Sequence, residues 1–401
     1  MSSVPESVRR VREVFRAFLV LGLTSFGGPV AHLGYFRTEF VARRRWLSEQ
    51  HYADLVALCQ FLPGPASSQV GFALGLLRAG PLGAAAAWLA FTLPSAVILI
   101  LFAYGSAVMQ GPLASGLIHG LKVVAVAIVA HAVWGMAKNL CPDRTRATIA
   151  LVAVLVVIAV SGPGGQVLAI ALGALAGLWW CRHAVDDSAE SLHFPVSVWA
   201  APLALGLFAV LLVALPLLAW WQPNTLVTLT DSFYRAGALV FGGGHVVLPL
   251  LEAEMVQPGL VTPDSFLAGY GAAQAIPGPL FTFAAYLGAV TDTAYHGLVG
   301  AGVALVAIFM PGFLLLIAIL PHWNRFRQFV WARAFMAGAS AAVVGVLGAA
   351  LYQPVFTSAI PGPYEFALAL TGFILLNTWK CPPWLVVLAL ALGGLGISLL
   401  P

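Results

Sequence analysis

Two segments of this chain place a glutamine shortly before a Pro-Gly-Pro turn, inside strongly apolar sequence. They are residues 60–65 (Gln-Phe-Leu-Pro-Gly-Pro) and residues 274–279 (Gln-Ala-Ile-Pro-Gly-Pro). Because proline and glycine interrupt a helix, each turn predicts free backbone N–H groups at the start of the helix that follows. These groups and the helix dipole together attract anions. We therefore expect an oxyanion site formed by Gln60, Pro63, Gly64, Pro65, Gln274, Pro277, Gly278 and Pro279.

Hydroxyl side chains and glycine clusters extend this pattern in both segments. A hydroxyl group follows each turn, and a glycine cluster precedes each turn by a similar interval. Hydroxyls and glutamine amides can donate to oxyanion oxygens, and glycine lets the backbone approach a ligand closely. The further expected ligands are Ser67, Ser68, Thr282, Gly27, Gly28, Gly242, Gly243, Gly244 and His245. The alternative for the glutamines is hydrogen bonding between membrane helices.

Charged residues within the apolar stretches form a second group of candidates, because a charge in the membrane is costly and often functional. Arg235 precedes the second glycine cluster and is the expected cationic ligand, with an ion pair to Asp231 as the structural alternative. Lys122 could act on the substrate or extend toward the headgroups. The candidates for charge or coupling are Lys122, Glu39, Glu254 and His32. For the two glutamates, pairing with a nearby arginine is the alternative to proton coupling.

The composition places these motifs in a bilayer, since 61% of the residues are hydrophobic and 8% are charged. Apolar stretches near the ~20 residues needed to span a membrane cover 81–109, 115–138, 148–160, 167–181, 196–221, 297–320, 330–352, 364–378 and 384–400. The basic residues flank these stretches, so the net charge of +4 indicates membrane orientation and no nucleic-acid partner. We expect an all-α integral membrane protein.

The recurrence of the motifs predicts two repeats, residues 1–183 and 225–401, joined by a linker with one extra transmembrane helix at 184–224. Each repeat is expected to contain two helical hairpins, broken at the Gly/Pro motifs, and about four transmembrane helices. Arginines near the first hairpins have acidic counterparts, Glu252 and Glu254, in the second repeat. This reversal predicts inverted repeats, with a cytoplasmic N-terminus and a periplasmic C-terminus.

The motifs do not favour an enzyme. Four cysteines lack the spacing of a metal or redox site, and the breaks have no repeated carboxylate pair and no set of nucleophile and base. We expect a carrier that needs no cofactor and no metal ion.

Several longer segments of the chain resemble the chromate ion transporter family in its two-domain form. They are residues 25–32, 36–41, 44–47, 78–80 and 91–95, with residues 241–249 and the two Pro-Gly-Pro turns. The resemblance implies a multi-pass protein of the bacterial inner membrane that exports chromate and thereby gives chromate resistance. It also implies coupling to the proton gradient or to anion exchange. A homodimer is one option for its assembly.

Two alternatives stay open from the residues alone. Sulfate is tetrahedral like chromate, and a site of backbone donors would distinguish the two ions poorly, so a sulfate or related oxyanion carrier is the first alternative. The second alternative is an anion channel lined by the hairpins. Uphill, saturable flux would separate a carrier from a channel.

Overall fold

The computed structural model describes residues 6–108, 111–160, 162–181, 196–197, 199–221, 225–241, 243–323 and 329–399. The regular elements of these residues are helices. Six of them are long and apolar enough to cross a membrane: Ala66–Ser106, Ser115–Leu140, Pro163–Trp180, Ala200–Trp221, Gly297–His322 and Val330–Ala359. The chain is therefore an all-helical, multi-pass membrane protein, as its composition predicted.

The first half begins with two short helical hairpins. Its helices are α1 (Glu6–Thr24), α2 (Gly28–Phe36), the π-helical η1 (Arg37–Arg43), α3 (Glu49–Phe61), α4 (Ala66–Val108), α5 (Pro112–Leu140), α6 (Arg144–Ala159) and α7 (Pro163–Trp180). The backbone leaves helical geometry at Ala79 and Gly80 inside α4. The part of α4 before this kink is the second arm of the second hairpin, and the part after it is a long apolar helix.

The second half follows α8 (Ala200–Trp221) and presents its elements in the same order. They are α9 (Thr225–Ala238), η2 (Gly244–Val246), α10 (Val247–Met255), α11 (Pro263–Gln274), η3 (Leu280–Thr282), α12 (Phe283–Val290), α13 (Gly297–Ile319), η4 (Leu320–His322), α15 (Val330–Ala350), η5 (Leu351–Phe356), α16 (Thr357–Ala359), α17 (Pro363–Asn377) and α18 (Pro383–Ser398). The helices break at the predicted Gly/Pro motifs in both halves.

Glycine makes the hairpin turns possible at these breaks. Gly27 has a φ of 100°, and Gly64 and Gly278 have φ values of 116° and 101°. These values lie in the left-handed region, which residues with a Cβ rarely adopt. The turns of the two halves therefore share an unusual backbone conformation as well as a sequence.

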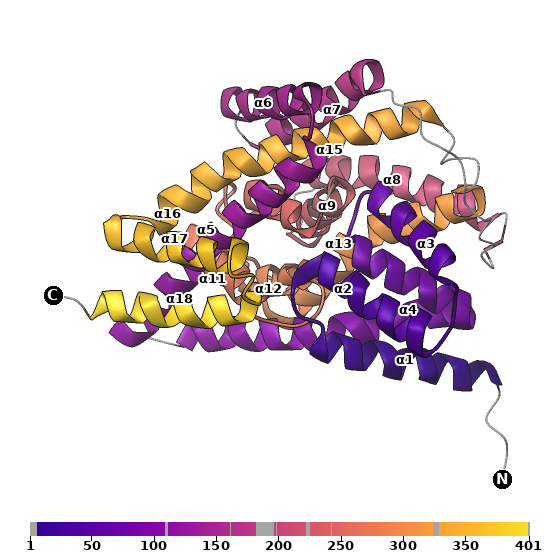
Figure 1. Cartoon of the computed structure of the whole chain (residues 1–401), viewed down its shortest axis with the longest axis horizontal. Coiled ribbons are helices and arrows are strands. Elements are labelled where there is room, and N and C mark those ends of the chain that lie inside the picture. Colours follow the sequence, from indigo (N-terminus) through magenta and orange to yellow (C-terminus); the bar gives the residue numbers. More distant parts are fainter. Residues whose placement is uncertain are drawn as a thin grey trace, which may run out of the picture.

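The last two helices of each half pack against a helix of the other half. Helix α5 packs against α17 and α18, while α15 packs against α6 and α7. Figure 1 shows α15 alongside α6 and α7. Glycines permit the close approach, because a Cβ at Gly120 would lie 2.6 Å from the Cα atom of Ala391, and one at Gly338 would lie 2.1 Å from the oxygen of Gly173. The two halves therefore interlock.

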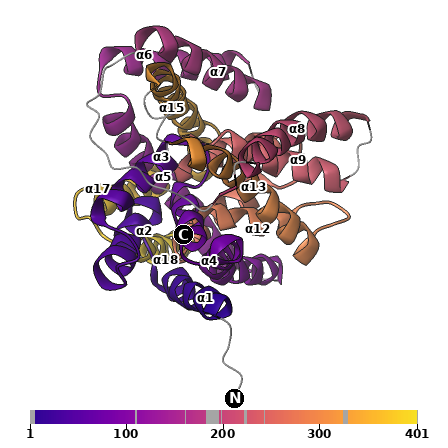
Figure 2. The same cartoon turned by 90° about the vertical axis from the view of Figure 1, so that its right-hand side faces the viewer.

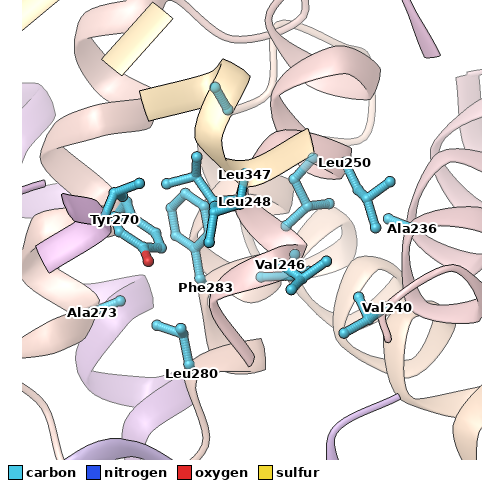
Figure 3. Close-up of a cluster of buried hydrophobic side chains, with 14 of the residues drawn as sticks. Ala236, Val240, Val246, Leu248, Leu250, Tyr270, Ala273, Leu280, Phe283 and Leu347 are labelled. Carbon is cyan, nitrogen blue, oxygen red and sulfur yellow. The ribbon is translucent and has the colours of Figure 1, made fainter. Parts of the chain in front are cut away.

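Separate apolar clusters support the hairpins of the two halves. In the first half, the rings of Phe18 and Phe40 stack with centroids 4.8 Å apart, and Phe36 meets Phe91 of α4 at 5.1 Å. In the second half, a buried cluster joins both hairpins to α15, with Val240, Val246, Leu248, Tyr270, Phe283 and Leu347 among its members (Figure 3). These clusters fix the hairpin tips on rigid supports.

Three of the predicted spans are shorter in the structure than the hydrocarbon core is thick. Helices α6, α17 and α18 contain 16, 15 and 16 residues, which corresponds to roughly 22–24 Å at 1.5 Å per residue, against a core of ~30 Å.

Helix α8 borders α9 and α13 on one side of the molecule (Figure 2), and Trp220 there is 85% exposed. Much of the predicted linker, residues 182–195, lies outside the described residues.

Candidate functional site

A cavity of about 710 Å³ lies where the hairpin tips of the two halves meet. It is lined by predicted site residues from both halves: Gly27, Gly28, Gln60, Gly64, Gly243, Gly244, His245 and Gln274. A small adjoining cavity adds Gly278 and shares Gly27, Gly28, His245 and Gln274. The fold thus brings both glycine clusters and both Pro-Gly-Pro motifs to one place, although they are far apart in the chain.

The two Pro-Gly-Pro tips are fixed by reciprocal hydrogen bonds between the halves. The N–H of Gly64 donates to the carbonyl oxygen of Val240 at 2.8 Å, and the N–H of Gly278 donates to that of Ser25 at 2.9 Å. Ser25 and Val240 each stand just before a glycine cluster. These two glycine N–H groups are therefore not free to bind an anion, which corrects the expectation for these two donors.

Neighbours from the opposite half also enclose the tips. A Cβ on Gly64 would lie 3.1 Å from the Cα atom of Gly312 in α13. A Cβ on Gly278 would lie 2.8 Å from the Oγ of Ser95 in α4. Gln69 adds to this contact, since its Nε2 donates to the carbonyl oxygens of Pro63 and Gly312, each at 3.0 Å. Each tip is thus packed against the long, proline-containing helix of the other half.

The cavity also contains polar residues that the sequence patterns did not single out. Lys380, in the loop between α17 and α18, lines it together with Asn139 and His131 of α5 and Ser340 of α15. Among the described lining residues, Lys380 is the only lysine or arginine, and none is aspartate or glutamate. The internal repeat gave no signal for these residues, because they lie outside the duplicated motifs.

The polar side chains that line the cavity differ in their exposure to solvent. Lys380, Asn139 and Gln60 are exposed, whereas Gln274 and His245 are partly buried. The Nδ1 of His245 lies 2.9 Å from the hydroxyl oxygen of Tyr270. The Nε2 of Gln274 is buried and has no hydrogen-bond partner among the described residues. A buried, unpartnered amide donor beside a cavity is suited to receive an acceptor atom from a ligand.

A second hollow of about 190 Å³ continues the cavity at its exposed end. It shares Gln60, Leu140 and Ser340 with the cavity and adds Arg146 and Arg333. The Nε of Arg146 is 2.6 Å from the Oδ2 of Asp143. The mouth of the cavity is therefore bordered by cationic side chains from both halves.

Several predicted ligands do not line either cavity. The hydroxyl residues Ser67, Ser68 and Thr282 are buried in the fold, where Ser67 lies 3.4 Å from His32 and Thr282 donates to the carbonyl oxygen of Pro279 at 2.7 Å. The prolines of the turns, Pro63, Pro65, Pro277 and Pro279, shape the tips without lining the cavities. Gly242 lies outside the described residues.

The structure does not support a direct ligand role for Arg235. Its Nη2 donates to Asp231 at 2.8 Å and to Glu254 at 2.9 Å, and it does not line the cavity. Two carboxylates therefore neutralise this guanidinium, and the structural alternative of an Asp231 pair is present. Glu254 is therefore ion-paired with Arg235, which is the alternative to proton coupling that the sequence had offered for this residue.

The remaining charge candidates also do not line the cavity. Lys122 donates to Asp264 at 2.6 Å, and Glu39 pairs with Arg43 and Arg44. His32 is 1% exposed, and its ring packs edge-on against Phe91. These contacts are structural in kind, so the charge of the cavity comes from Lys380 and not from the charged residues that the sequence had suggested.

The lining favours an anion with several acceptor oxygens. It offers one ammonium group, the amides of Gln60, Asn139 and Gln274, and the glycine backbone of the tips. A carboxylate would repel an anion, and the described lining residues include none. The volume allows an oxyanion together with several waters, each of which occupies about 30 Å³ in the liquid.

Comparisons with known proteins identify relatives that match both halves of the chain. The family model of chromate transporters matches residues 12–178 and 227–395. A chromate transport protein of Pseudomonas aeruginosa is 29% identical over 97% of this chain and 92% of its own length. A probable chromate transport protein of Synechococcus elongatus is 27% identical over 96% and 95%, and a chromate transport protein of Cupriavidus metallidurans is 27% identical over 96% and 92%. No solved structure matches the chain. The chain, with both halves matched, belongs to the chromate transporter family.

Proposed function

We propose that this protein carries chromate, a tetrahedral dianion, across the membrane by way of the cavity between the hairpin tips. The observation that carries the proposal is the lining: both halves contribute, Lys380 supplies a positive charge, and the described lining residues contain no carboxylate. The relatives named as chromate transport proteins supply the identity of the ion. The amides and the ammonium group would replace part of its hydration shell.

We further propose that the ion is exported from the cytoplasm of a bacterium across its inner membrane. The cavity is continuous with the hollow that holds Arg146 and Arg333. Cytoplasmic loops are enriched in lysine and arginine, so this mouth would face the cytoplasm. The same rule puts the N-terminus in the cytoplasm and the C-terminus in the periplasm. Export from this side would lower the chromate concentration in the cell and give resistance.

Alternating access would use the two halves as inverted repeats, residues 1–183 and 225–401. The reciprocal bonds of Gly64 and Gly278 support this proposal, because each tip is held by the other half in a similar way. Rocking of one half against the other would close the present mouth and open a second one between the same tips. The ion would stay bound near the glycine clusters during this motion.

Export against a gradient needs an energy source, and we propose the proton gradient or exchange with another anion. His245 and His131 line the cavity, and an imidazole nitrogen can accept or release a proton. A proton taken up with the substrate, or released against it, could pass through these imidazoles. Glu39 and Glu254 are ion-paired outside the cavity, which makes them weaker candidates.

Uptake of radiolabelled chromate into inverted membrane vesicles tests the proposal. Vesicles that contain the protein should accumulate chromate above the outside concentration when energised, with saturable kinetics. A protonophore should abolish this uptake if protons drive it, and anion preloading should stimulate uptake if exchange does. Sulfate, molybdate and phosphate serve as competitors. Absence of chromate uptake, or stronger transport of sulfate than of chromate, would reject chromate as the substrate.

A further inference from the structure

A separate basic pocket lies on the first helix and shares no lining residue with the transport cavity. It has a volume of about 420 Å³ and is lined by Arg9, Arg12, Glu13, Arg16 and Arg44. None of these residues lines the cavity between the hairpin tips. The three arginines of α1 are exposed, so their guanidinium groups are free to meet a ligand from outside.

The acidic residues near this pocket are committed to other arginines. Glu13 accepts from Arg44 through Oε1 at 3.4 Å and from Arg78 through Oε2 at 2.9 Å. Glu39 accepts from Arg44 at 2.6 Å and also pairs with Arg43.

Glu6, one helical turn before Arg9, is also paired with another arginine, because it accepts a hydrogen bond from Arg10 at 2.5 Å. Within the described part of the chain, Arg9, Arg12 and Arg16 make no ion pair with a carboxylate. The pocket therefore presents three arginines that are not ion-paired with a carboxylate.

Two lining residues of the pocket, Glu13 and Arg44, belong to a larger network of contacts. The guanidinium of Arg44 lies 5.8 Å from the ring centroid of Trp46, and that of Arg78 lies 5.3 Å from the same ring. Glu13 and Arg44, which line the pocket, are thus joined in a network of ion pairs and ring contacts beside the three arginines of α1. This part of the pocket is already ordered, so a ligand need not order it on binding.

The arginines share a helical face with exposed apolar residues. Positions 9, 12, 16, 20 and 23 follow the spacing of one face of an α-helix. Val20 is 59% exposed and Leu23 is 52% exposed. The face therefore begins with three cations and continues with apolar side chains that need a lipid environment.

We propose that this face of α1 binds an anionic phospholipid, with the phosphodiester headgroup between Arg9, Arg12 and Arg16 and an acyl chain along Val20 and Leu23. A free phosphate ion would satisfy the arginines but would leave the apolar continuation unused. A lipid satisfies both parts, and juxtamembrane arginines are known to attract anionic lipids. The site rests on the membrane location of the chain and not on its transport activity.

Native mass spectrometry of the full-length protein in detergent tests this site. Dioleoyl phosphatidylglycerol should bind tightly, while dioleoyl phosphatidylcholine, with the same chains and no net charge, should bind weakly. The variant Arg9→Gln/Arg12→Gln/Arg16→Gln should bind phosphatidylglycerol on the order of 10- to 100-fold more weakly. The variant Val20→Ser/Leu23→Ser should also weaken the binding of phosphatidylglycerol, but it should leave any binding of glycerol phosphate unchanged.

A matched control removes the same number of charges elsewhere on that side of the protein. Arg10→Gln/Arg37→Gln/Arg45→Gln changes three arginines that do not line the pocket, and it should keep the tight lipid. Thermal unfolding of each variant checks that the fold is intact. The proposal is overturned if both triple variants lose lipid equally, if phosphatidylcholine binds as tightly, or if inorganic phosphate displaces the lipid at equal concentration.

Discussion

Gly64 of the first half donates its backbone N–H to the carbonyl oxygen of Val240 in the second half, at 2.8 Å. The counterpart bond, from Gly278 to Ser25, reverses the roles of the halves. Each Pro-Gly-Pro tip is therefore anchored next to the glycine cluster of the opposite half. A rocking motion of the halves would act directly on these bonds, and the cavity lies beside them.

A side chain at either tip should stop transport. Gly64→Leu and Gly278→Leu place a Cβ 3.1 Å from Gly312 and 2.8 Å from Ser95, on backbone that disfavours any side chain. We expect loss of chromate uptake in vesicles for both variants. Gly302→Leu in α13 is the control, because a Cβ there meets nothing within 4 Å. Normal uptake by both tip variants would show that close packing of the tips is not needed.

Removal of the ammonium group of Lys380 should weaken binding of dianions. Lys380→Gln is expected to raise the apparent KM for chromate about tenfold, which corresponds to ~1.4 kcal/mol. Inhibition by a monoanion such as nitrate should change less, because the Coulomb energy scales with the charge of the ion. Lys380→Arg should restore much of the affinity. Lys138→Gln is the control, since Lys138 lies over the Trp134 ring outside the cavity. Equal effects of the two glutamine variants would contradict this role.

The three glutamines near the first and second tips should behave differently. Gln60→Leu and Gln274→Leu remove amides that line the cavity, so each should reduce chromate affinity by about 1–3 kcal/mol with little change in thermal stability. Gln69→Leu instead leaves the carbonyl oxygens of Pro63 and Gly312 unpaired and should lower the melting temperature. Isothermal titration and thermal unfolding of purified protein separate these two effects. Unchanged chromate affinity in both Gln60→Leu and Gln274→Leu would show that the substrate does not bind in this cavity.

Replacement of Arg235 should affect stability and not substrate affinity. Arg235→Gln leaves Asp231 and Glu254 without their cationic partner, and we expect a loss of roughly 1–3 kcal/mol in the free energy of unfolding, because the Arg235 side chain is partly exposed. The triple variant Asp231→Asn/Arg235→Gln/Glu254→Gln should recover part of this loss, because no unpaired charge is left. A large rise in KM for chromate with normal stability would instead restore Arg235 as a ligand.

The proposed inversion can be tested with two single cysteines. Ser48 and Thr262 are exposed N-cap residues of the equivalent helices α3 and α11. In a background in which Cys59, Cys141, Cys181 and Cys381 are replaced by alanine, Ser48→Cys and Thr262→Cys should react with an impermeant maleimide from opposite sides of the membrane. Reaction from the same side would exclude inverted repeats.

The sequence by itself determined the membrane location, the helix breaks and the duplicated motifs at the site. These features depend on local chemistry, because apolar composition requires a bilayer and glycine with proline interrupts a helix wherever it stands. The pairing of Gly27, Gln60 and Gly64 with Gly243 and Gln274 at one cavity also agrees with the repeat in the sequence.

Only the tertiary structure decided which charges face the cavity. The sequence offered Asp231, one turn before Arg235, as a partner, but it left open whether Arg235 is paired or faces the substrate. Packing brings Glu254 onto Arg235 as well, whereas the packing of α17 and α18 on α5 carries Lys380 to the mouth of the cavity. These last two contacts join residues that are distant in the chain, so local spacing could not decide between the alternatives.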